Sequence, residues 1–274
     1  MKQLSLREIK QIEFDLLKRF VSFCREHDIK YFLSNGTLLG AVKYHGFIPW
    51  DDDVDVLVPR ADYDKLVAVF RDDERYKLCA AERDPRCGFP FAKLCDMTTC
   101  KEELNIDNGM TLGVDIDIFP LDFWDDDLSR AHREVKQIHR NMFMLNLAKL
   151  ARADSAHPIK RLVKWIPMFL CKLLGKRYFI RRINRLCNQP KQMGSRYVGC
   201  KSWCIYGERE LIPAEVFSES VEVEFEGEHF CAPIGYDRYL RRLYGDYECD
   251  PPPEKQQTHH RYTAYWVADQ DRSI

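Results

Sequence analysis

Apolar residues recur every three or four positions at the start of the chain and alternate with polar residues further along. Ser5 and Glu8 form a capping-box pattern, and the apolar positions behind them predict an amphipathic helix that ends near His27. Residues 31–34 are typical of a short strand, which runs into a glycine-containing turn. A helical turn is predicted to follow over residues 38–42.

Two later segments alternate acidic with apolar side chains. The first places Asp53 and Asp55 next to valines, and the second, residues 114–119, places Asp115 and Asp117 next to isoleucines. Successive side chains of a strand point to opposite faces. Each segment is therefore predicted to be a strand that buries its apolar residues and directs two carboxylates to the other face.

The rest of the chain mixes helical and strand patterns. The sequence predicts helices over residues 62–70, 127–152, 159–174, 178–186 and 236–244, with breaks at Pro167 and Gly175. It predicts further strands over residues 76–80 and 89–94 and a hairpin that turns at Gly227. We therefore expect an α+β fold, with a mixed sheet flanked by helices and a basic helical insertion.

Charge is distributed unevenly, although the chain as a whole is nearly neutral. The 274 residues hold 42 Lys and Arg against 43 Asp and Glu, yet residues 158–190 contain nine basic side chains and no acidic one. Apolar residues interleave with these cations, as in a helix that lies on an anionic membrane surface. The alternative is a helical insertion with a solvated basic face. The acidic remainder and the lack of a nucleic-acid-reading motif argue against DNA or RNA as partners.

Other features of the sequence point to the cytoplasm. No apolar stretch approaches the roughly 20 residues of a membrane-spanning helix, and the first residues lack the apolar run of a secretory signal. Eleven cysteines, an odd number, favour reduced and mostly buried thiols. Cys200 and Cys204, taken with Cys95 and Cys100, lack the tight two-residue spacing that a zinc site would show.

The paired strand carboxylates are suited to a hard divalent cation. Mg²⁺ or Mn²⁺ takes oxygen ligands, and phosphoryl-transfer enzymes hold it with one or two carboxylates plus substrate phosphates. Asp53, Asp55 and one of Asp115 or Asp117 could supply these ligands, and the strand period does not separate the last two. The alternative is an exposed strand face with solvated charges.

Longer stretches of the sequence resemble the LicD family of the nucleotidyltransferase superfamily. The resemblance is carried by SNGTLLGAVKYHGFIPWDDDVDVLVPRADYDKL, residues 34–66, and extends through FAKLCDMTT (91–99), VDIDIFPLD (114–122) and YDRYLRRLYGDY (236–247) over nearly the whole chain. LicD proteins are bacterial transferases that move phosphocholine from CDP-choline to glycans. The resemblance implies a nucleotidyltransferase-like fold and a metal-dependent transfer that releases CMP.

The resemblance also implies roles for single acidic residues. Asp53 and Asp55 match the family's metal-binding pair, and Asp117 matches its third acid better than Asp115 does. These three carboxylates are therefore expected to be both the metal ligands and the catalytic residues.

Phosphate binding is expected from a second group of residues. Gly36 and Thr37 match the family's phosphate turn, where backbone amides and a hydroxyl could hold phosphate oxygens. Lys93 matches a basic position that follows, and Arg261 is a second candidate to hold phosphate charge. His260 is the candidate of the adjacent histidine pair for phosphate or metal.

Choline carries a quaternary ammonium group, which an aromatic cage would recognise. The residues that could include such a cage are Trp50, Trp203, Tyr206, Tyr262, Tyr265 and Trp266.

The sequence predicts a transferase that moves phosphocholine to a sugar hydroxyl of a lipid-linked glycan precursor, such as teichoic acid or lipopolysaccharide. Residues 1–150 would form the catalytic core, residues 151–190 the basic insertion, and residues 191–274 a hairpin, helix and tail that complete the catalytic domain. Through residues 158–190 the protein would lie on the inner face of the plasma membrane. The alternatives are transfer of ribitol phosphate or phosphoethanolamine, nucleotidyl transfer, and a non-catalytic membrane adaptor.

Overall fold

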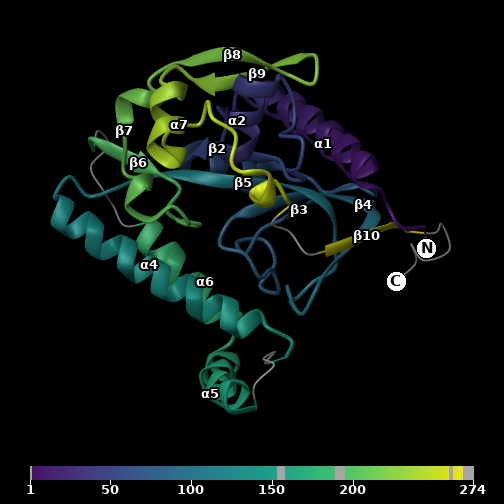
Figure 1. Cartoon of the computed structure of the whole chain (residues 1–274), viewed down its shortest axis with the longest axis vertical. Helices are drawn as coiled ribbons and strands as arrows, with labels where there is room; N and C mark the ends of the chain where they lie inside the picture. The colour runs from purple at the N-terminus through teal and green to yellow at the C-terminus, as the bar shows by residue number, and fades with distance from the viewer. Residues whose placement is uncertain (1, 153–157, 189–194, 259–261, 268–274) are drawn as a thin grey trace.

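A mixed β-sheet forms the centre of the protein (Figure 1). The computed structural model describes residues 2–152, 158–188, 195–258 and 262–267. The main path of the sheet has the order β1 (Phe32–Leu33), β2 (Asp55–Pro59), β5 (Leu112–Phe123), β4 (Ala92–Glu103) and β10 (Tyr262–Trp266). Strands β2 and β5 run parallel, and the other neighbours on this path are antiparallel. The sheet is completed by β3 (Tyr76–Cys79) on β4, and by β6 (Tyr197–Gly199) and β7 (Ile212–Pro213) beyond β5.

Helices flank this sheet, and the predicted α+β class is confirmed. The α-helices are α1 (Leu6–Glu26), α2 (Asn35–Tyr44), α3 (Arg60–Val69), α4 (Leu128–Lys149), α5 (Pro158–Leu174), α6 (Lys176–Cys187) and α7 (Tyr236–Tyr244). Short 3₁₀ turns cover Gly207–Glu210, Ala214–Phe217 and Pro253–Lys255, and a separate hairpin consists of β8 (Ser220–Phe225) and β9 (Glu228–Pro233). In the described part of the chain, none of the helices combines the length and the apolar character needed to span a membrane.

The sequence predictions that combine an apolar pattern with a helix cap or a turn are the ones that the structure confirms most closely. Helix α1 begins with the complete capping box of Ser5 and Glu8, and α7 ends at Gly245, whose φ of +79° suits glycine. The hairpin turn places Glu226 and Gly227 at positive φ, as a tight hairpin requires. In these places the cap or turn chemistry lies next to the periodic apolar pattern in the sequence.

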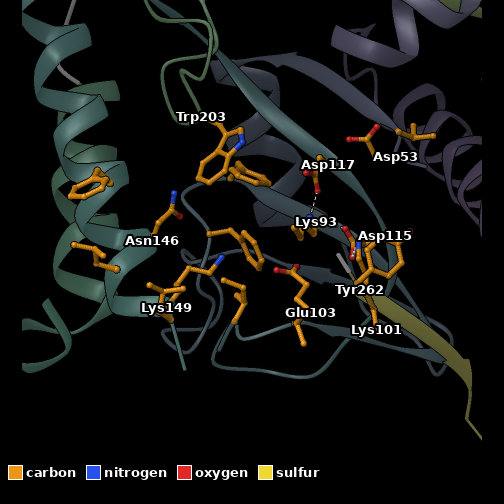
Figure 2. A pocket seen from close by; sticks show the side chains of 18 residues that line it. Asp53, Lys93, Lys101, Glu103, Asp115, Asp117, Asn146, Lys149, Trp203 and Tyr262 are labelled. Atoms are coloured by element: carbon orange, nitrogen blue, oxygen red, sulfur yellow. Dashed lines mark hydrogen bonds and ion pairs between the residues drawn. The ribbon is translucent and has the colours of Figure 1, made fainter. Parts of the chain in front are cut away.

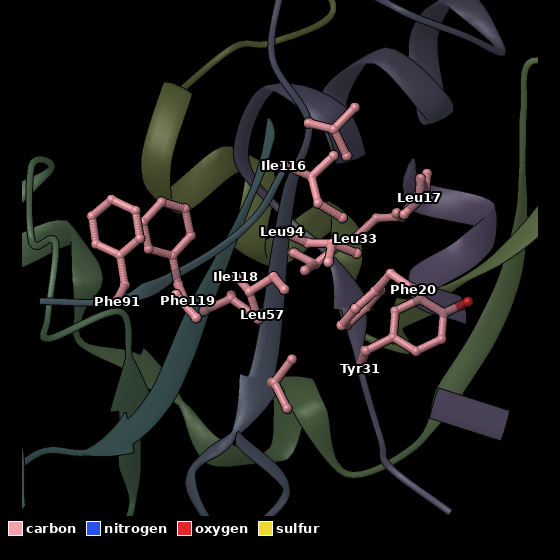
Figure 3. Close-up of a cluster of buried hydrophobic side chains, with 14 of the residues drawn as sticks. Leu17, Phe20, Tyr31, Leu33, Leu57, Phe91, Leu94, Ile116, Ile118 and Phe119 are labelled. Carbon is pink, nitrogen blue, oxygen red and sulfur yellow. The ribbon is translucent and has the colours of Figure 1, made fainter. Parts of the chain in front are cut away.

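The main core lies between α1 and the sheet. Figure 3 shows Leu17 and Phe20 of α1 with Leu33, Leu94 and Ile116 of three strands, and each of these side chains is at most 1% exposed. A buried apolar side chain of this size contributes about 2 kcal/mol to folding. The apolar residues between the strand acids are therefore fixed in the core, which holds the acids in place on the other side.

A second apolar cluster joins α4 to α6. It includes Ile138 and Leu145 of α4 and Phe179 and Ile183 of α6, all at most 1% exposed. Helix α5 follows α4 in the chain and lies below α4 and α6 in the view of Figure 1. The division into core, insertion and C-terminal part stays a prediction.

The expected helix break at Pro167 is wrong, whereas the break at Gly175 is confirmed. Helix α5 runs through Pro167, and α6 starts after Gly175, which has a φ of +80°. A proline inside a helix removes one backbone donor and crowds the preceding turn. The buried side chains of Met168 and Cys171 keep the following turns packed against the protein, which offsets this cost.

Strand β10, in the tail of the chain, was not predicted from the sequence. Residues Tyr262–Trp266 pair antiparallel with β4, and Ala264 accepts a hydrogen bond from the Leu4 N–H group at 2.8 Å. The start of the chain and β10 consequently lie side by side (Figure 1). Because this pairing joins segments more than 150 residues apart, no local pattern indicates it.

Candidate active site

Three charged side chains form a row across three neighbouring strands. Asp55 of β2 is the register partner of Asp117 of β5, and Asp117 is in turn opposite Lys93 of β4. Residues directly opposite each other in a sheet project to the same face. The sheet therefore places two carboxylates and one ammonium group side by side.

Asp53 joins this row from just outside the strand. The sequence predicts Asp53 inside the same strand as Asp55, but β2 begins only at Asp55. The carbonyl of Val54 nevertheless accepts a hydrogen bond from the Asp117 N–H group at 2.8 Å, so the chain is still paired with β5 there. The expected proximity of Asp53, Asp55 and Asp117 is retained, although the strand is shorter than predicted.

Helix α2 positions the backbone of Asp55. The Asp55 N–H group donates to the Thr37 hydroxyl oxygen at 2.8 Å, and its carbonyl accepts from the Ser34 N–H group at 3.1 Å. The sequence placed Gly36 and Thr37 in a turn before a short helix, whereas both lie in the first turn of α2. A Cβ atom on Gly36 would lie 2.6 Å from Asp51 Oδ2, so a larger residue there would have to displace the Asp51 side chain.

The two acids of β5 are held differently. Lys93 Nζ lies 2.7 Å from Asp115 Oδ1 and also pairs with Asp117, while Lys101 Nζ lies 3.2 Å from Asp115 Oδ2. Burial raises the pKa of Asp115, but Lys101 and Lys93 outweigh it and bring the pKa to about 2. For Asp117, burial dominates over Lys93, and its pKa is raised. The negative charge of Asp115 is thus balanced by two lysines, which indicates a structural role. The charge of Asp117 is balanced by Lys93, which Asp117 shares with Asp115.

Like charges surround Asp55. Burial raises its pKa well above the ordinary value, and Asp53 and Asp117 raise it further. A hydrogen bond from the Asn35 side chain opposes this shift, and the Tyr239 hydroxyl donates to Asn35 Oδ1 at 3.0 Å. A carboxylate held among other carboxylates in this way favours a bound cation.

A cavity of about 610 Å³ opens beside this row (Figure 2). The acids Asp53, Asp115 and Asp117 line it from the sheet, and α4 lines another side. The charged residues that the sequence analysis did not single out there are Lys101, Glu103 and Lys149. Only the strand order and the packing of α4 bring them to the cavity, so no motif marks them.

Glu13 of α1 is a second group that sequence reasoning missed. Its side chain is fully buried, and neither carboxylate oxygen has a hydrogen-bond partner among the described residues. Burial raises its pKa well above the ordinary value, and the charge of Asp53 adds to this shift. An acidic residue at a core-facing position of an otherwise apolar helix stripe is the signal that could have identified it.

Of the aromatic candidates for choline, Trp203 and Tyr262 line the cavity. Lys101 Nζ lies 4.4 Å from the Tyr262 ring centroid, so this ring already has a cationic neighbour. Tyr206 instead donates a hydrogen bond to Tyr244 at 2.9 Å. Trp50 lies near Tyr44, with the ring centroids 6.2 Å apart.

Two of the predicted ligand residues belong to the tail of the chain. His260 and Arg261 lie outside the described residues. Within the ranges that the structure describes, no three His, Cys, Asp or Glu side chains form a group that could hold a metal ion as it stands. All eleven cysteines are free and most are buried, as the sequence predicts.

Comparisons with known proteins place this chain in a family. The model of the LicD/FKTN/FKRP nucleotidyltransferase domain matches residues 28–151. The lipopolysaccharide cholinephosphotransferase LicD of Haemophilus influenzae is 30% identical over 97% of this chain and 99% of its own length. The uncharacterized proteins RP689 of Rickettsia prowazekii and RT0683 of Rickettsia typhi are each 41% identical over 49 residues, which is 18% of this chain and 18% and 16% of theirs.

Proposed function

The chain belongs to the LicD family, and on this premise we propose that it transfers phosphocholine from CDP-choline to a sugar hydroxyl of a lipid-linked glycan precursor. The observation that supports this best is the row of Asp55, Asp117 and Lys93 beside a cavity that Asp53 also lines. Such a site suits an anionic diphosphate donor, because its acids can act through a cation.

The proposed reaction exchanges the phosphoanhydride bond of the donor for a phosphoester bond to the acceptor. The acceptor hydroxyl oxygen forms a bond to the phosphorus of phosphocholine, the bond from this phosphorus to the oxygen of CMP breaks, and CMP leaves with the electron pair. The proton of the hydroxyl is released. Asp117 is the candidate to accept it, since its pKa is raised and it lines the cavity.

Mg²⁺ or Mn²⁺ is the cation that the donor set fits. Asp53, Asp55 and Asp117 offer only carboxylate oxygens, which hard divalent cations prefer, and burial together with the charges of Asp53 and Asp117 raises the pKa of Asp55. These three residues would hold the cation. When bound, it would supply positive charge to the phosphate oxygens and to the leaving group. Lys93 also pairs with Asp117.

The α5 and α6 helices support a peripheral location on the inner face of the plasma membrane. Six large apolar side chains of α5 are about half or more exposed: Trp165, Ile166, Phe169, Leu170, Leu173 and Leu174. On α6, Arg177, Arg181 and Arg185 follow at four-residue intervals and are exposed. Exposed apolar side chains next to exposed cations complement the acyl boundary and headgroups of an anionic bilayer. A lipid-linked acceptor would be presented there.

Phosphorus NMR tests the proposed reaction. Purified protein is incubated with CDP-choline, Mg²⁺ and a lipid-linked glycan extract, alongside the double variant Asp53→Asn, Asp55→Asn. A matched control is Asp64→Asn, whose side chain on α3 is 61% exposed. We expect CMP and a new phosphodiester signal in the wild type and the control, and neither in the double variant or without metal.

The same experiment separates the alternatives. Turnover of CDP-ribitol or CDP-ethanolamine, but not of CDP-choline, would retain the reaction class and replace the transferred group. Pyrophosphate released from CTP would indicate nucleotidyl transfer instead. Equal turnover in the wild type and the double variant would overturn the assigned site.

A further inference from the structure

Lys149 brings an ammonium group into the cavity from α4. It is the last residue of that helix and only 5% exposed. Its Nζ lies 3.9 Å from the ring centroid of Phe89, whose other cationic neighbour is Lys93 at 4.8 Å. Figure 2 shows the Lys149 side chain reaching from α4 toward the strands that carry the acids.

Lys149 differs from the other lysines of the cavity in having no counter-ion among the residues that the structure describes. Lys93 and Lys101 both pair with Asp115. Among the described residues, no carboxylate lies within ion-pair distance of Lys149, and the attraction of Glu103 acts from beyond that distance. The cavity consequently has carboxylates on the sheet side and the ammonium group of Lys149 on the α4 side.

A buried cation without a counter-ion is unfavourable unless an anion binds to it. Burial lowers the pKa of Lys149 to about 8; Glu103 and Cys87 oppose this shift, while Lys93 and Lys176 add to it. The group is still mostly protonated at pH 7. The aromatic neighbour Phe89 stabilises the cation only partly, because a cation–π contact is weaker than a charge-assisted hydrogen bond.

We propose that Lys149 is a substrate-binding residue that donates a hydrogen bond to a phosphate oxygen of the anionic donor. This rests on the proposed function, since it names the contact that the donor diphosphate makes on the α4 side. The acids act on the same diphosphate through a cation, and Lys149 acts on it directly. The two sides of the cavity would thus hold the diphosphate between them.

Calorimetric binding of inorganic pyrophosphate, CDP-choline and cytidine tests this proposal. The variants are Lys149→Met and Lys149→Arg, and the matched control is Lys136→Met, an exposed lysine of the same helix. Binding is measured with Mg²⁺ and with chelator, after a thermal melt has confirmed that each variant folds. We expect Lys149→Met to weaken pyrophosphate and CDP-choline binding about 10- to 100-fold, since a hydrogen bond to a charged group contributes that much.

The control variants, the nucleoside and the pH dependence give further expected results. Lys149→Arg retains most of the affinity, Lys136→Met retains all of it, and any cytidine affinity is unchanged. Wild-type affinity for pyrophosphate falls as the pH rises from 7 to 9.5, and Lys149→Met loses this dependence. A purely structural contact with Phe89 would not produce a pH dependence specific to phosphate.

The two proposals fail in different ways. Wild-type binding of CDP-choline with an unchanged Lys149→Met variant would overturn the role of Lys149 and leave the proposed function standing. Lys149-dependent binding of pyrophosphate without binding of CDP-choline would support Lys149 and overturn the donor. A wild type that binds no pyrophosphate under either condition would overturn the role of Lys149.

Discussion

Lys93 Nζ lies 2.7 Å from Asp115 Oδ1 and pairs at the same time with Asp117, so one ammonium group joins both acids of β5. Asp115 has Lys101 as a second partner, whereas Asp117 is the register neighbour of Asp55. The strand period leaves these two acids equivalent. From their different partners we infer that Asp117 acts in the reaction and that Asp115 holds the lysines.

Asparagine substitutions at the two positions should therefore have opposite main effects. Asp117→Asn is expected to reduce turnover by orders of magnitude while the protein stays folded, because in the proposed reaction its carboxylate both holds the cation and accepts the proton. Asp115→Asn should lower the free energy of unfolding by about 3 kcal/mol, because it leaves two buried ammonium groups with one acid. Urea unfolding and CMP release measure the two effects. Normal turnover in Asp117→Asn with a stable but inactive Asp115→Asn would reverse the assignment.

The acids could be predicted because their pattern is local. Asp53, Asp55, Asp115 and Asp117 all stand out by alternation with buried apolar residues, and that alternation needs no knowledge of which strands are neighbours, although it does not separate Asp115 from Asp117. The roles of Lys93 and Lys101 could not be worked out in the same way. Their pairing with Asp115 depends on the antiparallel register of β4 and β5.

The contact between Thr37 and Asp55 predicts a stability effect. Thr37→Val removes the oxygen that accepts the buried Asp55 N–H group at 2.8 Å, and an unsatisfied buried donor costs about 1–3 kcal/mol. Thr37→Ser keeps the oxygen and should lose much less. Urea unfolding of both variants gives the comparison, and turnover should fall further in Thr37→Val because Asp55 is no longer held in place. Equal stability of the two variants would show that the hydroxyl does not position Asp55.

Acid unfolding should report the ion pairs of Asp115. Its pKa is about 2 in the folded protein against an ordinary value of 3.8, so it contributes about 2 kcal/mol that is present above pH 4 and lost as the pH falls to 2. Asp55 and Asp117 have raised pKa values and act in the opposite direction. The Asp115→Asn variant retains both of these acids. The difference in unfolding free energy between wild type and that variant should therefore shrink between pH 4 and pH 2, and a constant difference would contradict the assignment.

The remaining site residues depend on long-range packing. Lys149 is one of two lysines in the helical pattern of α4, and only the packing of α4 selects it to line the cavity. Glu13 is buried because α1 lies on β4 and β5, the strands that carry the charged residues. Strand β10 pairs across more than 150 residues. These features require the tertiary structure, whereas caps, turns and alternating strands are visible in short windows.

The three exposed arginines at four-residue intervals on α6 predict charge-dependent membrane binding. Each basic side chain near an anionic surface contributes about 1 kcal/mol, so changing Arg177, Arg181 and Arg185 to Gln should weaken binding to phosphatidylglycerol vesicles on the order of 100-fold. The control changes three other exposed cations on α4 to Gln: Arg133, Lys136 and Arg140. Vesicle co-sedimentation in low and high salt measures the effect. We expect the wild type and the control to bind and to be released by salt, and the α6 variant to bind weakly in both. Equal losses in both triple variants would indicate attraction by overall charge rather than by this face.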